Sequence, residues 1–172
     1  LACKPQPTTS LNAGPECVYC PKYYEDVGQI LPQATDVGLD VPFLGGDGWD
    51  GVTQYATAEQ LDGCYFCANY ATGSNPDFES AYEAEYGEPY PNGFSPLGYD
   101  AALTVCGGLQ AAEEAGLEPG SDEYKQAVID GIKNGSFEGV TGSFTFDDHN
   151  DPVKTAAILT FENGEAVFVE QY

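Results

Sequence analysis

Basic residues and methionine are scarce in this sequence. Its 172 residues include five lysines and arginines against 28 aspartates and glutamates, one histidine and no methionine. The formal charge of −23 repels polyanions, so the composition excludes nucleic acids and anionic membrane surfaces as partners. We interpret the acidity as the solvated surface of a secreted or salt-exposed protein.

Long apolar runs are also absent. None approaches the ~20 residues of a membrane-spanning helix, and the sequence does not open with the basic and apolar regions of a signal peptide. We therefore expect a soluble chain that forms one domain or two small lobes. The absence of an initiator methionine fits either a processed product or a fragment of a longer protein.

The cysteines raise the question of a zinc site. Valine, tyrosine and phenylalanine, which favour strands, fill the middle of two CxxC sequences. Residues i and i+3 of a strand point to opposite faces, so the two thiols of one pair can neither chelate one ion nor bond to each other. We expect the pairs to lie on different parallel strands without zinc, as buried thiols or in disulfides with other cysteines. The pairs are Cys17 with Cys20 and Cys64 with Cys67, and Cys3 and Cys106 lie outside them.

Strand and helix patterns alternate along the first half of the chain, which predicts parallel strand pairing. Pro32 lies inside the first long helical pattern, where a proline costs ~3 kcal/mol, so we expect a kink or an interruption there. Near the C-terminus apolar residues recur at every second position, which is typical of strands, and Asn163-Gly164 predicts a type I′ hairpin. The fold class is therefore α/β, a Rossmann-like parallel sheet with flanking helices and a C-terminal antiparallel hairpin. The predicted strands are 16–20, 41–44, 63–69, 156–161 and 166–170, and the predicted helices are 23–37, 57–61, 77–86, 95–115 and 121–134.

A glycine-rich turn, Gly-Gly-Asp-Gly, follows the predicted strand 41–44. It places the carboxylate of Asp47 at the carboxyl edge of a parallel sheet, where open α/β folds bind ligands. A tight turn with solvated Asp47 and Asp50 and a packed Trp49 explains the same residues equally well. The turn is no phosphate loop, because it has no lysine and its aspartates repel phosphate.

Several segments carry a family resemblance. They are YYEDVGQIL at 23–31, PFLGGDGW at 42–49, GCYF at 63–66, LGYDA at 97–101 and GVTG at 139–142. In this order they resemble the second lobe of the substrate-binding proteins that serve branched-chain amino acid ABC transporters. The resemblance implies part of a type I periplasmic-binding fold, in which two α/β lobes close on a small ligand. It divides the chain into an irregular lead-in (1–13), a second-lobe α/β segment (14–75), a helical segment that belongs to the first lobe in the family (76–137), and hinge-proximal strands with the hairpin (138–172).

The resemblance also implies a ligand site. Tyr23 opens a helix at the position of a ligand-contacting tyrosine, and Asp47 occupies the position that receives the ligand's ammonium group. Trp49 is expected as a wall of the cleft and Tyr99 as a hinge-side ligand residue. The opening half of the first lobe, with its groups for the ligand carboxylate, has no counterpart in this sequence. A separate chain, or self-association, would then have to cover the helices at 95–115 and 121–134.

Three classes of function compete. The leading hypothesis is an extracytoplasmic solute-binding module that holds an amino-acid-like ligand for the membrane subunits of an ABC transporter, without catalysis, cofactor or metal. The alternative is a structural or assembly subunit built from half of a binding-protein fold. An enzyme is disfavoured, although Asp47, Asp50 and His149 could in principle do acid–base chemistry, because His149 lies in a polar connection typical of a solvated loop.

Overall fold

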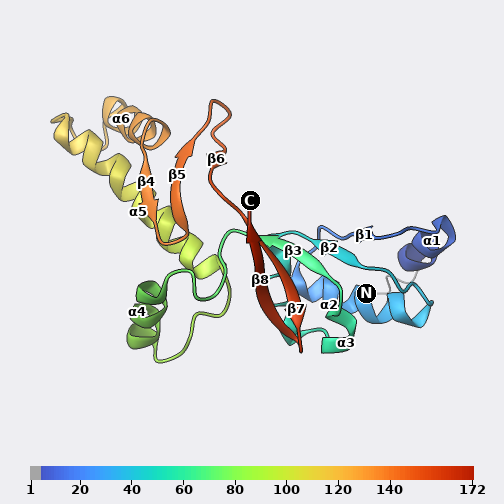
Figure 1. Cartoon of the computed structure of the whole chain (residues 1–172). Helices are drawn as coiled ribbons and strands as arrows, with labels where there is room; N and C mark the ends of the chain where they lie inside the picture. Colours follow the sequence, from blue (N-terminus) through green and yellow to red (C-terminus); the bar gives the residue numbers. More distant parts are fainter. Residues whose placement is uncertain (1–4) are drawn as a thin grey trace. The chain divides into compact units, whose positions relative to one another are not determined.

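The structure is a computed structural model that describes residues 5–172. It forms two compact units, and Figure 1 labels their helices and strands. Unit 1 contains the described residues up to Ala71 together with Ala156–Tyr172, and unit 2 is Thr72–Thr155. Within the segment 138–172, β6 (Pro152–Val153) pairs with β5 (Gly142–Phe146) in unit 2, and the strand after it joins the sheet of unit 1.

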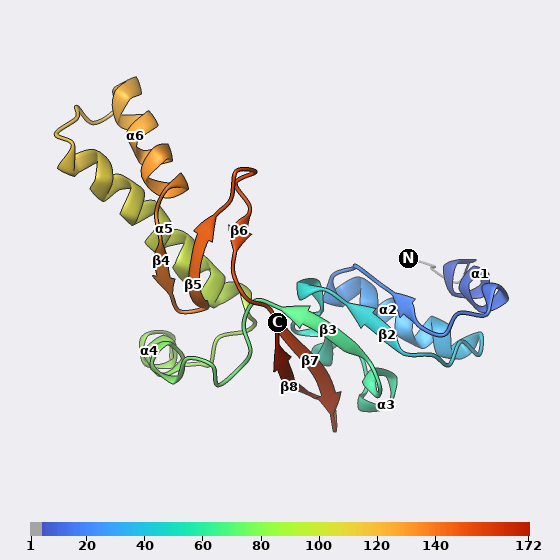
Figure 2. The ribbon, with the colours of Figure 1, turned by 45° about the horizontal axis from the view of Figure 1, so that its top comes forward.

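The sheet of unit 1 confirms the predicted α/β architecture. Its first three strands are parallel, and the two strands of the C-terminal hairpin extend it in antiparallel pairing (Figure 2). Asn163 and Gly164 both have positive φ, at 55° and 84°, as a type I′ turn requires. In spatial order the strands are β1 (Val18–Tyr19), β2 (Phe43–Gly45), β3 (Tyr65–Ala68), β7 (Ala157–Glu162) and β8 (Glu165–Gln171).

The helices of unit 1 differ from expectation at residues 5–13, and the helix that contains Pro32 has no interruption. Residues 5–13, expected to be irregular, form α1 (Pro5–Ala13); prolines are tolerated in the first turn of a helix because its N–H groups have no intrahelical partner. Residues 1–4 of that expected lead-in lie outside the described part of the chain. Helix α2 (Tyr24–Asp36) is not interrupted at Pro32. It buries Leu31 and Ala34 on either side of the proline, and this packing offsets the missing hydrogen bond.

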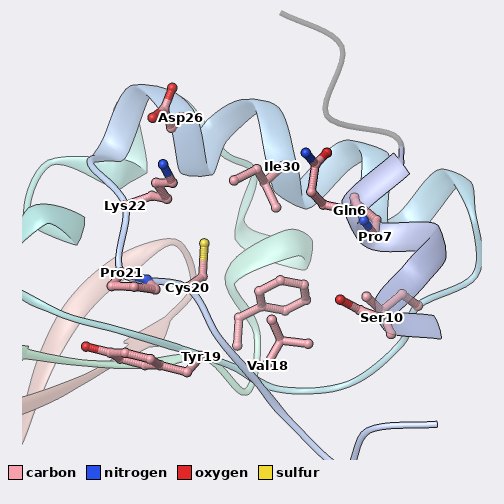
Figure 3. A pocket seen from close by; sticks show the side chains of 12 residues that line it. Gln6, Pro7, Ser10, Val18, Tyr19, Cys20, Pro21, Lys22, Asp26 and Ile30 are labelled. Carbon is pink, nitrogen blue, oxygen red and sulfur yellow. The ribbon is translucent and has the colours of Figure 1, made fainter. Parts of the chain in front are cut away.

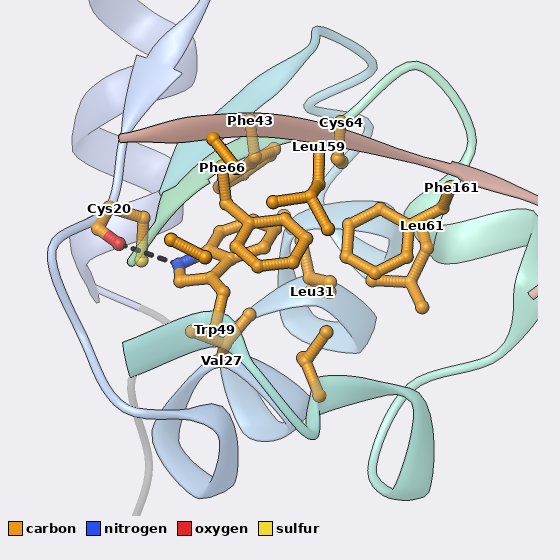
Figure 4. Close-up of a cluster of buried hydrophobic side chains, with 14 of the residues drawn as sticks. Cys20, Val27, Leu31, Phe43, Trp49, Leu61, Cys64, Phe66, Leu159 and Phe161 are labelled. Atoms are coloured by element: carbon orange, nitrogen blue, oxygen red, sulfur yellow. Dashed lines mark hydrogen bonds between the residues drawn. The ribbon is translucent and has the colours of Figure 1, made fainter. Parts of the chain in front are cut away.

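The core of unit 1 fills the space between one face of the sheet and helices α2 and α3 (Ala58–Leu61). Alternate side chains of β3 show the division, because Phe66 and Ala68 are buried while Tyr65 and Cys67 are exposed. Figure 4 shows the centre of this core, where side chains from α2, α3 and three strands surround an indole ring. The buried members include Val27, Leu31, Phe43, Trp49, Leu61, Phe66, Leu159 and Phe161.

Unit 2 pairs a helical hairpin with a small antiparallel sheet. Gly108 lies where α5 and α6 meet, and a Cβ atom there would stand 2.7 Å from the carbonyl oxygen of Val128. Across the same contact, a Cβ at Gly131 would stand 2.8 Å from the Cβ of Ala111. Gly108 and Gly131 therefore allow the two helices to pack closely. The elements are α4 (Pro76–Tyr86), α5 (Phe94–Glu114), α6 (Asp122–Lys133), β4 (Phe137–Gly139), β5 and β6.

A buried carboxylate joins α5 to the strands of unit 2. Asp100 accepts hydrogen bonds from the backbone N–H of Val140 at 2.7 Å and of Thr141 at 3.0 Å, and from the Thr141 hydroxyl at 2.5 Å. Lys154 donates to the same hydroxyl oxygen. Burial lowers the pKa of the Lys154 ammonium, and the charge of Asp100 opposes that shift. The turn between β4 and β5 is thus fixed to the first half of α5.

The cysteine pairs lie at β1 and β3, which are separated by β2 in the same sheet. Cys17 and Cys20 flank the two residues of β1, and Cys64 directly precedes β3, which contains Cys67. Cys17 and Cys67 are exposed, whereas Cys20 and Cys64 are buried, so the two thiols of each pair differ in exposure as expected. Cys17, Cys64, Cys67 and Cys106 are not in disulfides. Burial raises the pKa of the Cys64 thiol, which disfavours the reactive thiolate.

This arrangement predicts a graded reactivity of the thiols. In the native chain, iodoacetamide should modify Cys17, Cys67 and Cys106 at least about tenfold faster than Cys64, because alkylation needs an accessible thiolate. Peptide mass spectrometry after timed quenching measures each rate, with the denatured chain as the control in which the differences should vanish. Equal native rates at Cys64 and Cys67 would contradict the strand orientation.

Candidate ligand-binding site

Two chain segments leave the sheet of unit 1 side by side. Strands β1 and β2 are parallel, with Tyr19 opposite Leu44, and the Cys20 N–H donates to the Leu44 carbonyl at 2.8 Å. The segment after β1 leads to Tyr23 and helix α2, while the segment after β2 forms the Gly-Gly-Asp-Gly turn and the short 3₁₀ helix η1 (Asp47–Trp49). Both segments therefore begin at the carboxyl edge of the sheet, as expected for a ligand site in an α/β fold.

Two glycines of the turn lie in close contact with neighbouring groups, and the contact at Gly45 leaves no room for a side chain. A Cβ atom at Gly45 would stand 2.4 Å from atoms of the Trp49 indole. A Cβ at Gly48 would stand 3.0 Å from the carbonyl oxygen of Lys22 and 3.2 Å from the ring of Tyr23. The turn thus packs directly on the residue that opens α2, and the structure brings the turn of Asp47 next to Tyr23.

Tyr23 and Asp47 are both available to a ligand in unit 1. The side chain of Tyr23 is 65% exposed although it lies against the turn, and Asp47 is exposed at the start of η1. A carboxylate can accept hydrogen bonds from an ammonium group, and a tyrosine ring offers an apolar face and a hydroxyl. The turn that carries Asp47 thus adjoins Tyr23, and both side chains are exposed.

Trp49 is not a wall of a cleft, and that expectation was wrong. Its side chain is 0% exposed, and its indole N–H donates to the carbonyl oxygen of Cys20 at 2.9 Å (Figure 4). The centre of the Phe161 ring lies 6.4 Å from the centre of the indole ring. The packed tryptophan, which the sequence allowed as an alternative, is the arrangement found, because the indole fills the space above Gly45 and satisfies a buried carbonyl group.

Tyr99 belongs to unit 2, whereas Tyr23 and Asp47 belong to unit 1. It lies on α5, is 55% exposed and packs edge-on against Phe78, with 5.7 Å between the ring centres. Together with Tyr82 it lines a cavity of about 330 Å³ between α4 and α5. The residue that follows Tyr99 in the sequence is the buried Asp100, whose structural role no local sequence pattern indicates.

Of the candidates for acid–base chemistry, Asp50 lies in unit 1 with Asp47, and His149 belongs to unit 2. His149 is exposed in unit 2, in a turn where its N–H and that of Asp151 donate to the carboxylate of Asp147 at 2.8 and 2.9 Å. The expectation of a solvated loop is confirmed. Within residues 5–172, no group of three or more histidine, cysteine, aspartate or glutamate side chains is arranged to hold a metal ion. None of the described helices is both long and apolar enough to cross a membrane.

The structure thus has an α/β sheet with an exposed carboxylate and tyrosine at its carboxyl edge, joined to a second unit by two chain crossings. Comparison with protein families identifies the class of protein. The family described as periplasmic binding protein matches residues 4–166. The chain belongs to that family, as its sequence motifs suggested.

Three relatives illustrate the match, and the chain spans less than half the length of each. The leucine-, isoleucine-, valine-, threonine- and alanine-binding protein of Pseudomonas aeruginosa is 28% identical over 143 residues, which are 81% of this chain and 36% of that protein. The leucine-binding protein LivK of Thermotoga maritima superimposes with a TM-score of 0.77 at 24% identity, over 96% of this chain and 47% of that one. The branched-chain amino acid transporter substrate-binding protein LivJ of Streptococcus pneumoniae, solved with isoleucine, gives a TM-score of 0.68 at 34% identity, over 90% and 44%.

The packing of Trp49 generates a prediction about stability. Trp49→Phe should lower the free energy of unfolding by about 2–4 kcal/mol, because the smaller ring leaves a cavity and the Cys20 carbonyl loses its donor. Urea denaturation followed by circular dichroism measures the change. Tyr19→Phe, at an exposed aromatic side chain of the same unit, is the matched control and should change stability by less than about 0.5 kcal/mol. Similar losses in the two variants would remove Trp49 from the core.

Proposed function

We propose that this chain is part of an extracytoplasmic solute-binding protein whose ligand is a small amino-acid-like molecule. The observation that carries the proposal is the contact of the Gly-Gly-Asp-Gly turn with Tyr23, which joins an exposed carboxylate and an exposed aromatic ring at the carboxyl edge of the sheet. The relatives support the ligand class, because the name of one states leucine, isoleucine and valine binding and another was solved with isoleucine.

In this proposal Asp47 accepts hydrogen bonds from the ligand's ammonium group, and Tyr23 covers its apolar part. Both groups are exposed in unit 1, so the site is completed when a second surface closes over them and removes water. A carboxylate–ammonium pair is much stronger in such a cleft than in open solvent. The proposed role is binding and release without catalysis, and the bound molecule passes to the membrane subunits of an ABC transporter.

An assembly role remains the second proposal, and one observation favours it. Helices α5 and α6 of unit 2 expose apolar side chains, among them Val105 at 50% and Ile129 at 55%. Covering such side chains stabilises an association with another polypeptide. The partner in this proposal is either a separate chain that supplies the first lobe or a second copy of this chain.

The binding proposal is tested with Asp47→Ala. The chain is reconstituted with a first-lobe chain so that the cleft can close, and L-leucine binding is measured by calorimetry. Loss of the carboxylate should weaken binding by tens- to thousands-fold, because truncating one partner of a desolvated charge pair costs ~2–5 kcal/mol. The matched control is Asp62→Ala, which removes an exposed carboxylate after α3 and should leave the affinity unchanged.

Two results would count against this account. Equal affinities of the parent and Asp47→Ala would remove Asp47 from the site. No binding of any amino acid by an assembly that scattering shows to be closed would favour the assembly role instead.

A further inference from the structure

A second cavity lies in unit 1, between helix α1, strand β1 and helix α2 (Figure 3). Its volume is about 400 Å³, within the usual range of small-molecule sites. Neither Tyr23 nor Asp47 lines it. The segment after β1 separates the two places, because the carbonyl of Lys22 faces Gly48 of the turn while the side chain of Lys22 lines the cavity.

The floor of the cavity is apolar. Val18 and Ile30 pack against the core of unit 1 from outside and remain partly exposed, and Leu39 and Phe43 extend the same surface from within the core. A branched hydrocarbon group placed here would cover the exposed parts of these side chains. Burial of apolar surface would favour such a ligand at roughly 25 cal/mol for each Å² removed from water.

One end of the cavity carries two opposite charges. Figure 3 shows Lys22 and Asp26 together at this end, and Gln6 and Ser10 of α1 at the other. Lys22 is one of only five basic residues in the sequence. Among residues 5–172, no ion pair is formed between Lys22 and Asp26, so an ammonium and a carboxylate are presented side by side.

We propose that this cavity binds a small α-amino acid with an apolar side chain. The ligand carboxylate lies next to Lys22, the ligand ammonium next to Asp26, and the side chain enters the space between Val18 and Ile30. An α-amino acid matches these features because it carries two adjacent opposite charges on one hydrocarbon body. This site is separate from the one proposed at Tyr23 and Asp47, and either can fail without the other.

The test uses the 172-residue chain with methyl-labelled isoleucine and the Asp47→Ala substitution, so that only the second site is probed. Addition of L-leucine should shift the methyl signal of Ile30, which lines the cavity, and leave that of Ile158 on β7 unchanged. Isocaproate and isoamylamine each keep the hydrocarbon body and one charge, and each should bind at least about fivefold more weakly than leucine.

Variants of the charged end identify the site. Lys22→Gln and Asp26→Asn should each weaken leucine binding about fivefold, the upper range for exposed charge pairs. Lys125→Gln, which removes an exposed ammonium paired with Asp122 in unit 2, is the control and should have no effect. Ser10→Trp, which places a large side chain in the cavity, should abolish the shift of Ile30.

The proposal is overturned if millimolar leucine leaves the Ile30 signal in place. It is also overturned if Ile30 and Ile158 shift equally, or if Lys22→Gln and Asp26→Asn bind leucine as the parent does.

Discussion

The hydrogen bond between the Trp49 indole and the Cys20 carbonyl is the contact on which the arrangement of unit 1 depends. It joins the segment that follows β1 to the turn that follows β2. Both segments have there passed the end of the backbone pairing between the two strands. The indole is fully buried, so the bond has no competition from water. Gly45 is required by the same contact, because any side chain there would occupy the place of the indole ring. Through Phe161 and Phe66, whose ring centres are 5.3 Å apart, the packing reaches β7 and β3.

This packing has a consequence for the proposed ligand site. Binding is strong when the groups that contact a ligand are already held in place, because little conformational entropy is then lost. Tyr23 and Asp47 are themselves exposed, but the backbone beneath them is fixed by Trp49 and by the close contact of Gly48 with Lys22 and Tyr23. The glycines of the turn therefore serve packing, and the aspartate is left exposed for the binding role that we propose.

The sequence predicted those helices, strands and turns that local sequence patterns specify. Each of these patterns extends over only a few residues. Alternating apolar residues predicted the strands, the helical spacing around Val27 and Leu31 predicted α2, and Asn163-Gly164 predicted the hairpin. The opposite exposure of the two thiols in each cysteine pair was predicted from strand geometry, although only Cys67 lies within a strand. Long-range contacts could not be predicted in this way. The bond of Asp100 to Val140 spans 40 positions and that of Trp49 to Cys20 spans 29, and no local pattern announces either. The error at Trp49 arose because a tryptophan beside a glycine-rich turn fits a cleft and a core equally well.

The central claim is that the buried indole of Trp49 holds the turn of Asp47 in place, and hydrogen exchange of the indole N–H tests it most directly. Because the group is fully buried and donates to the Cys20 carbonyl, exchange requires unit 1 to open. The indole signal in a proton–nitrogen NMR spectrum should therefore decay at least about a thousandfold more slowly than in the urea-denatured chain at the same pH and temperature. Exchange at the rate of the denatured chain would show that Trp49 is open to water, and would contradict the account.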